Sequence, residues 1–353
     1  MFRSSGRRPP PRQRKQTGAA ARRWVARWFA FGGVGTLVVV GLWLFGWVSG
    51  NHQSPMPVEV TSTGIVAPTV PVGQNLRPTP GATNPVPTAS PGATLSLHDP
   101  ALAQAMLAAI NADRQANGLA PVAWDVTAAT AGAAHAADMA AQNYFSHWSP
   151  DGHGPELRYN RAGGTDNAME NIFTWFSRSS DGQPGPVDSF TALVAEAEAS
   201  LMQSPGHRRN ILTPSHTHVG VGFAYNPQTG SFYLVQEFVD RYVAMEPLPL
   251  TGQLGTQITV AGRLLPGATA PLLNLTYAPF PQPLSLDELN ATGSYQRDAT
   301  IYASLQPQRN GAGSFSTTIA LDNERRPGVY SVRVWITVDG EQVPASEQLL
   351  EVR

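Results

Sequence analysis

Two histidines and one glutamate are the residues of this chain most able to do chemistry. His147, Glu170 and His207 each lie in a loop or at the end of a predicted element, outside the apolar stripe of any helix. Such segments often carry binding and catalytic residues. Two imidazoles and a carboxylate suit a divalent ion such as zinc, which takes about three protein ligands when it also keeps a water. A zinc-bound water could attack a peptide or ester bond, and a His/Glu acid–base pair without metal is equally compatible with these residue types.

The spacing of these residues does not choose between the chemistries. Glu170 follows His147 by 23 residues and precedes His207 by 37, and no His-Glu-x-x-His helix is present. Ser146 and Ser204 lie beside or near the histidines, but a nucleophile requires geometry that spacing does not supply. A structural role is the other alternative, in which Glu170 accepts hydrogen bonds from backbone amides and histidines and ties loops to a sheet.

Four motifs follow one another through the middle of the chain. They are NYFSHWSPDG at 143–152, MENI at 169–172, SPGHRRNIL at 204–212 and VGVG at 219–222. Taken together, these motifs resemble the CAP/SCP domain family (cysteine-rich secretory, antigen 5 and pathogenesis-related-1 proteins) in its cysteine-free bacterial form. The resemblance covers about residues 97–243.

The resemblance implies an α/β/α sandwich with a central cavity where two histidines and two glutamates converge. His147 matches the first histidine of the family pattern, Glu170 the glutamate of the Glu-Asn-Ile segment, and His207 the second histidine. It also implies binding of sterols, lipids, glycans or partner proteins, with proteolysis in only a few members.

The second glutamate of the family pattern is expected on the third helix near a tryptophan, and this chain departs from the pattern there. Leu201 stands where the tryptophan is expected, Glu196 and Glu198 are the nearby carboxylates, and Ser204 is an alternative for that place. We therefore predict a cavity that contains His147, Glu170, His207, Ser204 and Glu198, with His147, Glu170 and His207 as candidates for catalysis and for metal binding.

The elements that must position these residues follow from hydrophobic spacing and breakers. Helices are predicted from Asp99 to Asn117, from about 126 to 143 and from about 187 to 203, because apolar residues recur there at helical spacing. A strand is predicted at 171–176, and a hairpin at 219–225 and 231–239 around the turn at 226–230.

Four other polar residues in this region have simpler interpretations. His216 and His218 share one face of a predicted strand end, where a polar loop face is favoured over a surface metal pair. Arg208 and Arg209 could recognise a carboxylate or phosphate on a ligand, or form surface salt bridges.

Residues 246–353 differ from the preceding domain because short β-rich runs alternate with Pro, Gly and Asn. Six runs have this character, at 257–264, 272–277, 300–305, 314–321, 330–338 and 342–352. This pattern predicts an Ig-like β-sandwich. It contains no catalytic constellation, so a structural cap is favoured over a domain that adheres to wall polymers.

The first 96 residues predict a membrane anchor and a stalk. Residues 1–27 form a basic, Pro/Arg-rich leader, and residues 28–48 contain no charge over 21 residues, enough for a transmembrane helix. Because the arginines all precede this segment, the N-terminus is predicted in the cytoplasm and the C-terminal domains outside. A cleaved signal peptide is the alternative, but no Ala-x-Ala site follows. Residues 49–96 are a Pro/Thr-rich linker.

Composition excludes several kinds of protein. The chain has no cysteine, which excludes disulfides, thiol catalysis and a lipid anchor on cysteine. The first 50 residues hold nine basic and no acidic residues, which leaves 15 basic and 25 acidic residues in the remainder. A nucleic-acid-binding protein is expected to carry basic charge on a folded domain, so nucleic acid is not predicted as a partner.

These observations combine into an α+β protein of the bacterial envelope. The predicted order is leader (1–27), transmembrane helix (28–48), linker (49–96), CAP-like domain (97–245) and β-sandwich (246–353). The first functional hypothesis is a binding module for a metal, lipid, glycan or peptide. The second is a metal-assisted hydrolase with Glu170 or an added carboxylate as general base, and the third is a structural or adhesive protein that binds through the β-sandwich. No enzyme activity is predicted outright.

Overall fold

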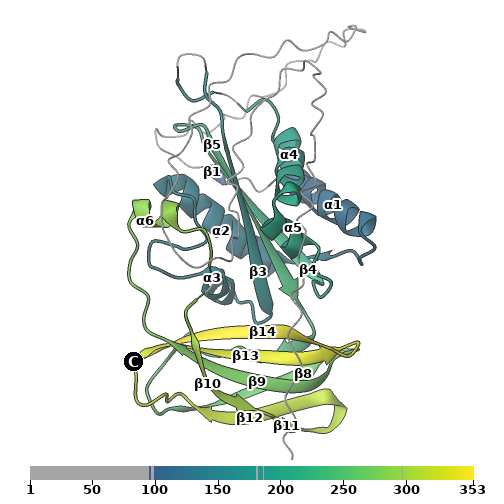
Figure 1. Ribbon diagram of the computed structural model, residues 1–353, viewed down its shortest axis with the longest axis vertical. Coiled ribbons are helices and arrows are strands. Elements are labelled where there is room, and N and C mark those ends of the chain that lie inside the picture. The colour runs from purple at the N-terminus through teal and green to yellow at the C-terminus, as the bar shows by residue number, and fades with distance from the viewer. Residues whose placement is uncertain (1–94, 97–98, 180–181, 186, 296) are drawn as a thin grey trace, which may run out of the picture. The chain divides into compact units, whose positions relative to one another are not determined.

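The computed structural model describes residues 95–96, 99–179, 182–185, 187–295 and 297–353 (Figure 1). The predicted leader, the predicted transmembrane helix at 28–48 and nearly all of the predicted linker lie outside these residues. Among the described helices, none is both long and apolar enough to cross a membrane.

The first domain, which extends from β1 at residue 95 to residue 240, is a mixed helix and sheet structure. Its sheet has the order β1-β4-β5-β3, and β2 pairs with β4 in parallel. The strands are β1 (Leu95–Ser96), β2 (Ala123–Trp124), β3 (Asn167–Phe176), β4 (His218–Asn226) and β5 (Ser231–Asp240). The helices are α1 (Pro100–Ala116), α2 (Val126–Gln142), α3 (Pro155–Arg161), α4 (Phe190–Gln203) and α5 (Pro205–Ile211).

Local sequence explains where the longer helices begin. Asp99 accepts a hydrogen bond from the N–H of Ala101 and is followed by proline at the first helical position. Asp125 caps α2 in the same way, and Ser189 caps α4. The predicted hairpin is present as β4 and β5, whose register runs without interruption from His218 to Asn226.

Helices cover both faces of the sheet (Figure 1). Helix α2 packs on one face so closely that a Cβ on Gly220 or Gly222 would overlap the α2 backbone near Ala129 and Ala133. The Gly-x-Gly pattern of β4 and the alanines of α2 therefore allow the helix and the strand to pack this closely. Helices α1 and α4 contribute to an apolar core with the other face, which includes Met106, Val194 and Phe238, among others.

The second domain, residues 243–353, consists of two facing β-sheets. One has the order β10-β9-β13-β14-β7 and the other β11-β12-β8-β6. The strands are β6 (Val243–Met245), β7 (Thr251–Gly252), β8 (Gln257–Leu264), β9 (Thr269–Ala278), β10 (Thr300–Leu305), β11 (Gln308–Arg309), β12 (Ser314–Ala320), β13 (Gly328–Val338) and β14 (Glu341–Val352). An apolar cluster of residues from both sheets, such as Val260, Phe315 and Val334, forms the core. These sheets agree with the predicted β character; the Ig-like topology stays a prediction.

A segment between β9 and β10 leaves the second domain and packs on the first. We call residues 279–295 the arm; it contains the short helix α6 (Leu286–Ala291). Leu289 is fully buried in a cluster with α2 residues such as Met139. The arm also accepts hydrogen bonds from Trp148 Nε1 at Ser294 O (2.6 Å) and from Phe145 N at Asn290 Oδ1 (2.8 Å). The two domains are thus joined by specific contacts as well as by the chain.

Candidate functional site

Glu170 lies at the centre of the candidate site and is held from two sides. The strand β3 places it beside the loop that follows α2, where His147 Nδ1 donates a hydrogen bond to Glu170 Oε1 (2.7 Å). From α3, Arg158 Nη2 donates to Glu170 Oε2 at the same distance. The side chain of Glu170 is fully buried, and both its carboxylate oxygens are engaged.

The charges around Glu170 fix its protonation state. Burial acts to raise the pKa of Glu170, but Arg158 and the neighbouring histidines outweigh burial and hold that pKa well below its ordinary range. Glu170 is therefore a carboxylate at neutral pH. Because a carboxylate only accepts hydrogen bonds, the bonded Nδ1 of His147 carries a proton.

A second buried carboxyl lies directly opposite Glu170. Glu237 on β5 is the register partner of Glu170 and is fully buried. Burial and the negative charge of Glu170 raise the pKa of Glu237 well above its ordinary value, although Arg158 lowers it. Glu237 is thus a neutral acid beside a charged one, because two like charges this close and this buried do not both ionise.

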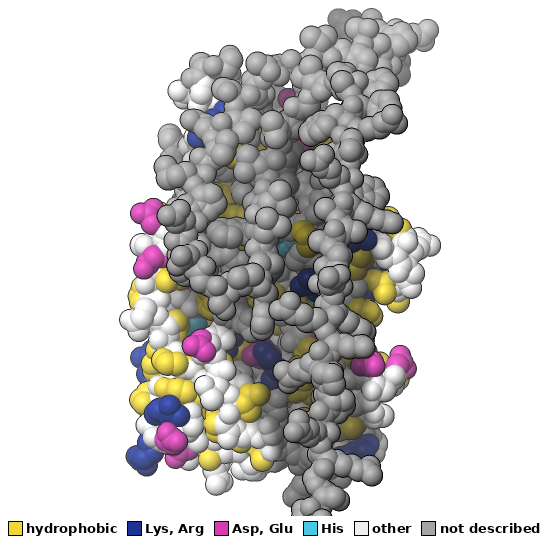
Figure 2. All heavy atoms as spheres, in the orientation of Figure 1, with side chains coloured by type: hydrophobic (Ala, Val, Ile, Leu, Met, Phe, Trp, Pro, Cys, Tyr) yellow, Lys and Arg dark blue, Asp and Glu magenta, His cyan; other side chains and the backbone are white. Residues whose placement is uncertain are grey.

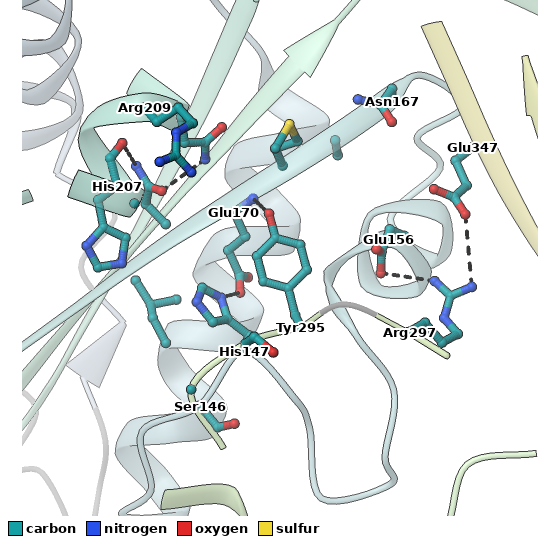
Figure 3. Close-up of a pocket in the computed structure, with 18 of the residues that line it drawn as sticks. Ser146, His147, Glu156, Asn167, Glu170, His207, Arg209, Tyr295, Arg297 and Glu347 are labelled. Atoms are coloured by element: carbon teal, nitrogen blue, oxygen red, sulfur yellow. Dashed lines mark hydrogen bonds and ion pairs between the residues drawn. The ribbon is translucent and has the colours of Figure 1, made fainter. Parts of the chain in front are cut away.

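His207 approaches from α5, on the other side of β3 from His147 (Figure 3). Burial lowers the pKa of His207 to about 4, with a further contribution from His147. The ring is therefore neutral at pH 7. Its Nδ1 is buried and has no hydrogen-bond partner among the described residues. No hydrogen bond or ion pair within the described chain joins His207 to His147 or Glu170, so the three residues share a cavity without forming one cluster.

One cavity of about 680 Å³ contains these side chains and is lined by both domains. The first domain contributes His147, Glu170, His207 and Ser204. The second contributes Tyr295 from the arm, Arg297 just after it, and Trp335 from β13, among others. Figure 3 shows Tyr295 lying beside His147 and directed at the backbone of Glu170. The hydroxyl of Tyr295 accepts a hydrogen bond from the Glu170 N–H (3.2 Å).

Comparison with known proteins identifies a domain in the middle of the chain. Residues 107–238 match the model of the family described as CAP, the Cysteine-rich secretory protein family. The uncharacterized protein YkwD of Bacillus subtilis (strain 168) is 35% identical over 133 residues, which are 37% of this chain and 44% of that protein. The chain contains a CAP domain. The match spans less than half the length of that relative.

Two solved structures are also similar to this chain. One is an extracellular protein containing a SCP domain from Bacillus anthracis str. Ames, with 28% identity, 40% of this chain and 41% of that chain covered, and a TM-score of 0.30. The other is an outer surface protein from Borrelia burgdorferi, with 14% identity, 42% of this chain and 99% of that chain covered, and a TM-score of 0.34.

Glu198 of the CAP domain lies apart from the cavity. On α4 it is buried against Gln236 of β5, whose Nε2 donates to Glu198 Oε2 (2.5 Å). Burial raises the pKa of Glu198 to about 8, and the bond from Gln236 only partly opposes this. Ser204, the alternative for the same place in the family pattern, does line the cavity. Glu156 of α3 also lines the cavity and forms an ion pair with Arg297 (3.2 Å).

The described residues do not form the ligand cluster that the predicted metal site requires. Among the described residues, no group of three or more His, Asp or Glu side chains is placed to hold a metal ion. The reason is visible at Glu170, where His147 Nδ1 and Arg158 already occupy both carboxylate oxygens. The residues as arranged do not fit a zinc site, and we derive no step through one.

A chain of buried polar side chains leads from the cavity wall into the CAP domain. Asn171 donates to Gln236 and accepts from Asn210 (2.9 Å), and Asn210 Oδ1 bonds to His216 Nε2 (3.0 Å). His216 Nδ1 bonds in turn to Asp240 (2.8 Å). The expectation that His216 lies on a polar loop face is therefore wrong, because these partners allow the imidazole to be buried.

The CAP domain also uses polar residues that the motifs did not single out. Arg158, Glu156 and Glu237 are all absent from the predicted site. One signal pointed to Glu237: Gln236 and Glu237 interrupt an otherwise apolar strand, and charged residues are rarely buried without a partner. On the face shown in Figure 2, acidic and basic side chains are interspersed among the visible described residues, without an extended basic patch.

Proposed function

We propose that the protein is an extracellular binding protein whose ligand occupies the cavity shared by the CAP domain and the C-terminal β domain. The cavity volume of about 680 Å³ falls within the range of roughly 300–1,000 Å³ that small-molecule and cofactor sites occupy. Apolar and aromatic side chains such as Ile172 and Tyr295 line it together with several polar groups.

The observation that carries this proposal is a pair of buried polar atoms without partners, one from each domain. Nδ1 of His207 in the CAP domain and Nε1 of Trp335 in the β domain are buried and lack a hydrogen-bond partner among the described residues. Both residues line the same cavity. An unpaired buried polar group is unfavourable by about 1–3 kcal/mol, so a ligand that pairs with both would recover that energy on binding.

Hydrolysis with Glu170 as general base is less well supported. A base must accept a proton, and Glu170 has a lowered pKa and two oxygens already bonded. The 2.7 Å bond from His147 to Glu170 favours instead a second candidate function, in which Glu170 orients His147 and the imidazole Nε2 is the base. Hydrolysis that persists in His147→Ala would contradict this second candidate.

The location of the protein is part of the proposal. The similar Bacillus anthracis protein is an extracellular protein, and the uncharged segment 28–48 would anchor this chain with its two domains outside. Protease added to intact cells should remove the CAP and β domains from a carbonate-resistant membrane fraction. A soluble product that begins near residue 50 would contradict the anchor.

Calorimetry on the purified full chain tests the binding function. The probes are a random octapeptide pool, chitin oligosaccharides, phospholipid vesicles and zinc chloride, each titrated separately. Trp335→Phe keeps an aromatic side chain but removes the Nε1–H, and we expect it to weaken binding by about tenfold, the equivalent of one hydrogen bond of about 1.4 kcal/mol. Trp175→Phe is the matched control, because Trp175 packs against the α1/α4 core and does not line the cavity. Equal affinity in wild type and Trp335→Phe, or no binding of any probe, would contradict the proposal.

A further inference from the structure

The free edge of β3 is the feature of the cavity that best indicates the class of its ligand. β3 is the last strand in the order of its sheet and pairs only with β5 among the described strands. Its register with β5 runs from Asn167 to Phe176 without a bulge. In such a pair, the backbone groups of alternate residues point to the partner strand, and those of the residues between point away.

Two hydrogen bonds fix which residues of β3 point away. The N–H of Ser177, just beyond the strand, donates to Gly230 O next to β5 (3.0 Å), so odd-numbered residues face β5. The N–H of Glu170 donates to the Tyr295 hydroxyl on the opposite side (3.2 Å). Both observations agree that the even-numbered residues present their N–H and C=O groups to the free edge.

This free edge forms one wall of the cavity. Every residue from Asn167 to Thr174 lines the cavity. Of the outward N–H groups at Ala168, Glu170, Ile172 and Thr174, only that of Glu170 has a hydrogen-bond partner in the described part of the chain. The cavity is therefore bordered by a row of backbone donors and acceptors. Such an edge is unusual, because proteins normally cover or block the edge strands of their sheets.

We propose that the ligand is an extended polypeptide segment that pairs with the edge of β3 between Ala168 and Thr174. This inference rests on the proposed binding function and names its ligand class. A peptide carries N–H and C=O groups at the repeat of a strand, so it can satisfy several edge groups together. Seven residues of strand span about 23 Å at roughly 3.3 Å per residue. A glycan lacks this regular repeat of donors and acceptors, and a lipid chain would leave the edge groups unpaired.

The charges of the cavity favour an acidic peptide. The cavity carboxylates are paired: Glu156 with Arg297, Glu170 with Arg158, and Glu347 with Arg333. Arg209 lines the cavity from α5, and its guanidinium forms no ion pair with any described residue. Figure 3 shows Arg209 beside His207 on that side of β3. An aspartate, a glutamate or a C-terminal carboxylate on the peptide would therefore find a free cation here.

A second copy of the chain is the other possible occupant of a free strand edge, and the arm opposes it. Tyr295 lies at the edge beside Glu170 in every copy. Two β3 edges paired with each other would bring both arms to the same place. A short peptide brings no second arm to this place, so only the Tyr295 hydroxyl at the Glu170 N–H must give way to it.

The test uses the purified full chain and synthetic peptides. Octapeptides are first enriched from an immobilised random library, and the best binder is then resynthesised with one backbone N-methyl group at each position in turn. N-methylation removes a single N–H and leaves the side chains in place. Edge pairing predicts loss of at least tenfold in affinity at alternate positions and much smaller losses between them. Enriched sequences should be acidic and should lose affinity in Arg209→Ala.

A pair of protein variants tests the same contact from the other side. Thr174→Pro removes the outward N–H, and Thr174→Val keeps it, while both lose the hydroxyl bond to Phe232 O. We expect peptide affinity at least tenfold lower for Thr174→Pro than for Thr174→Val. If Thr174→Pro does not fold, the N-methyl series alone decides.

Each remaining outcome separates this inference from the proposed function. Peptides that bind with no alternation in the N-methyl series overturn edge pairing but leave binding in the cavity standing. A second outcome leads to the same conclusion: no peptide is enriched, but chitin oligosaccharides bind and bind more weakly to Trp335→Phe. Concentration-dependent dimerisation that Thr174→Pro abolishes would assign the edge to a second copy. Failure of every probe removes both proposals.

Discussion

Tyr295 of the arm lies against His147 of the CAP domain, with their ring centroids 4.6 Å apart and the planes tilted by 51°. The same tyrosine accepts the hydrogen bond from the Glu170 N–H. A residue of the second domain therefore contacts both members of the His147–Glu170 pair. This contact makes the β domain part of the site, which argues against a passive cap.

Removal of the Tyr295 hydroxyl should destabilise the protein modestly. Tyr295→Phe keeps the ring contact with His147 but leaves the Glu170 N–H without its acceptor. We expect the free energy of unfolding in urea to fall by about 1 kcal/mol. Tyr302→Phe is the control, because the Tyr302 hydroxyl makes no hydrogen bond with a described residue. Equal losses in the two variants would show that the hydroxyl contact does not matter.

Arg158 should stabilise the fold through Glu170 in a pH-dependent way. Arg158→Met leaves a buried carboxylate with only His147 as partner. At pH 7 we expect a loss of about 3–5 kcal/mol in the free energy of unfolding, as for other broken buried ion pairs. The exposed neighbour Arg161 pairs at the surface with Asp151, so Arg161→Met should lose less than about 1 kcal/mol.

The sign of the pH dependence follows from the lowered pKa of Glu170 in the folded state. Such a group stabilises the fold above its unfolded pKa of about 4.3 and loses this effect as the pH falls below that value. The difference between wild type and Arg158→Met should therefore be large at pH 7 and shrink on acidification below about pH 5. A difference that stays constant from pH 7 to pH 3 would contradict the assigned role.

Glu198 should give the free energy of unfolding a pH dependence of the opposite sign. Its pKa is raised to about 8 in the folded state, so the folded form keeps a proton that the unfolded form releases above about pH 4.3. This contribution to stability is present at low pH and is lost as the pH rises toward 8, by at most about 1.4 kcal/mol per pH unit. Glu198→Gln should remove that slope in urea titrations between pH 5 and pH 8. The prediction is wrong if the variant and wild type change in parallel.

Part of this site could be predicted from the sequence because its motifs are local. The motifs around His147, Glu170 and His207 are each a few residues long, and these three residues line one cavity. Helical spacing alone would have placed Glu198 in the core, because it lies one turn after Val194 on the buried face of α4. The family pattern pointed to the cavity instead.

The contribution of the second domain could not be predicted in this way. Alternation of apolar residues indicated its strands, because each strand buries one face. The contact between Tyr295 and Glu170 joins residues 125 positions apart and depends on how the arm packs on α2. No local pattern encodes such a contact, and an arm of mixed polar and apolar residues has the composition of an ordinary loop.

Another contact between the domains is made by Asn160, which takes the place of a strand partner beside β14. Its Nδ2 donates to Glu347 O (3.0 Å) and its Oδ1 accepts from the N–H of Leu349 (2.9 Å). Both backbone groups are buried. The side chain of one residue in α3 thus satisfies a donor and an acceptor of the second domain.

Asn160→Ala should uncouple the unfolding of the two domains. It leaves the Leu349 N–H and the Glu347 C=O without partners, at about 1–3 kcal/mol for each group. Because this loss falls at the contact between domains, scanning calorimetry should show two separated transitions where wild type shows one. Asn117→Ala is the matched control, since the exposed Asn117 side chain bonds Asp113 O at the end of α1 and contacts no residue of the second domain. A single transition with an unchanged midpoint in Asn160→Ala would mean that other contacts hold the domains together, such as the arm with Leu289, the Glu156–Arg297 ion pair and the Ser346 hydroxyl bond to Thr165 O.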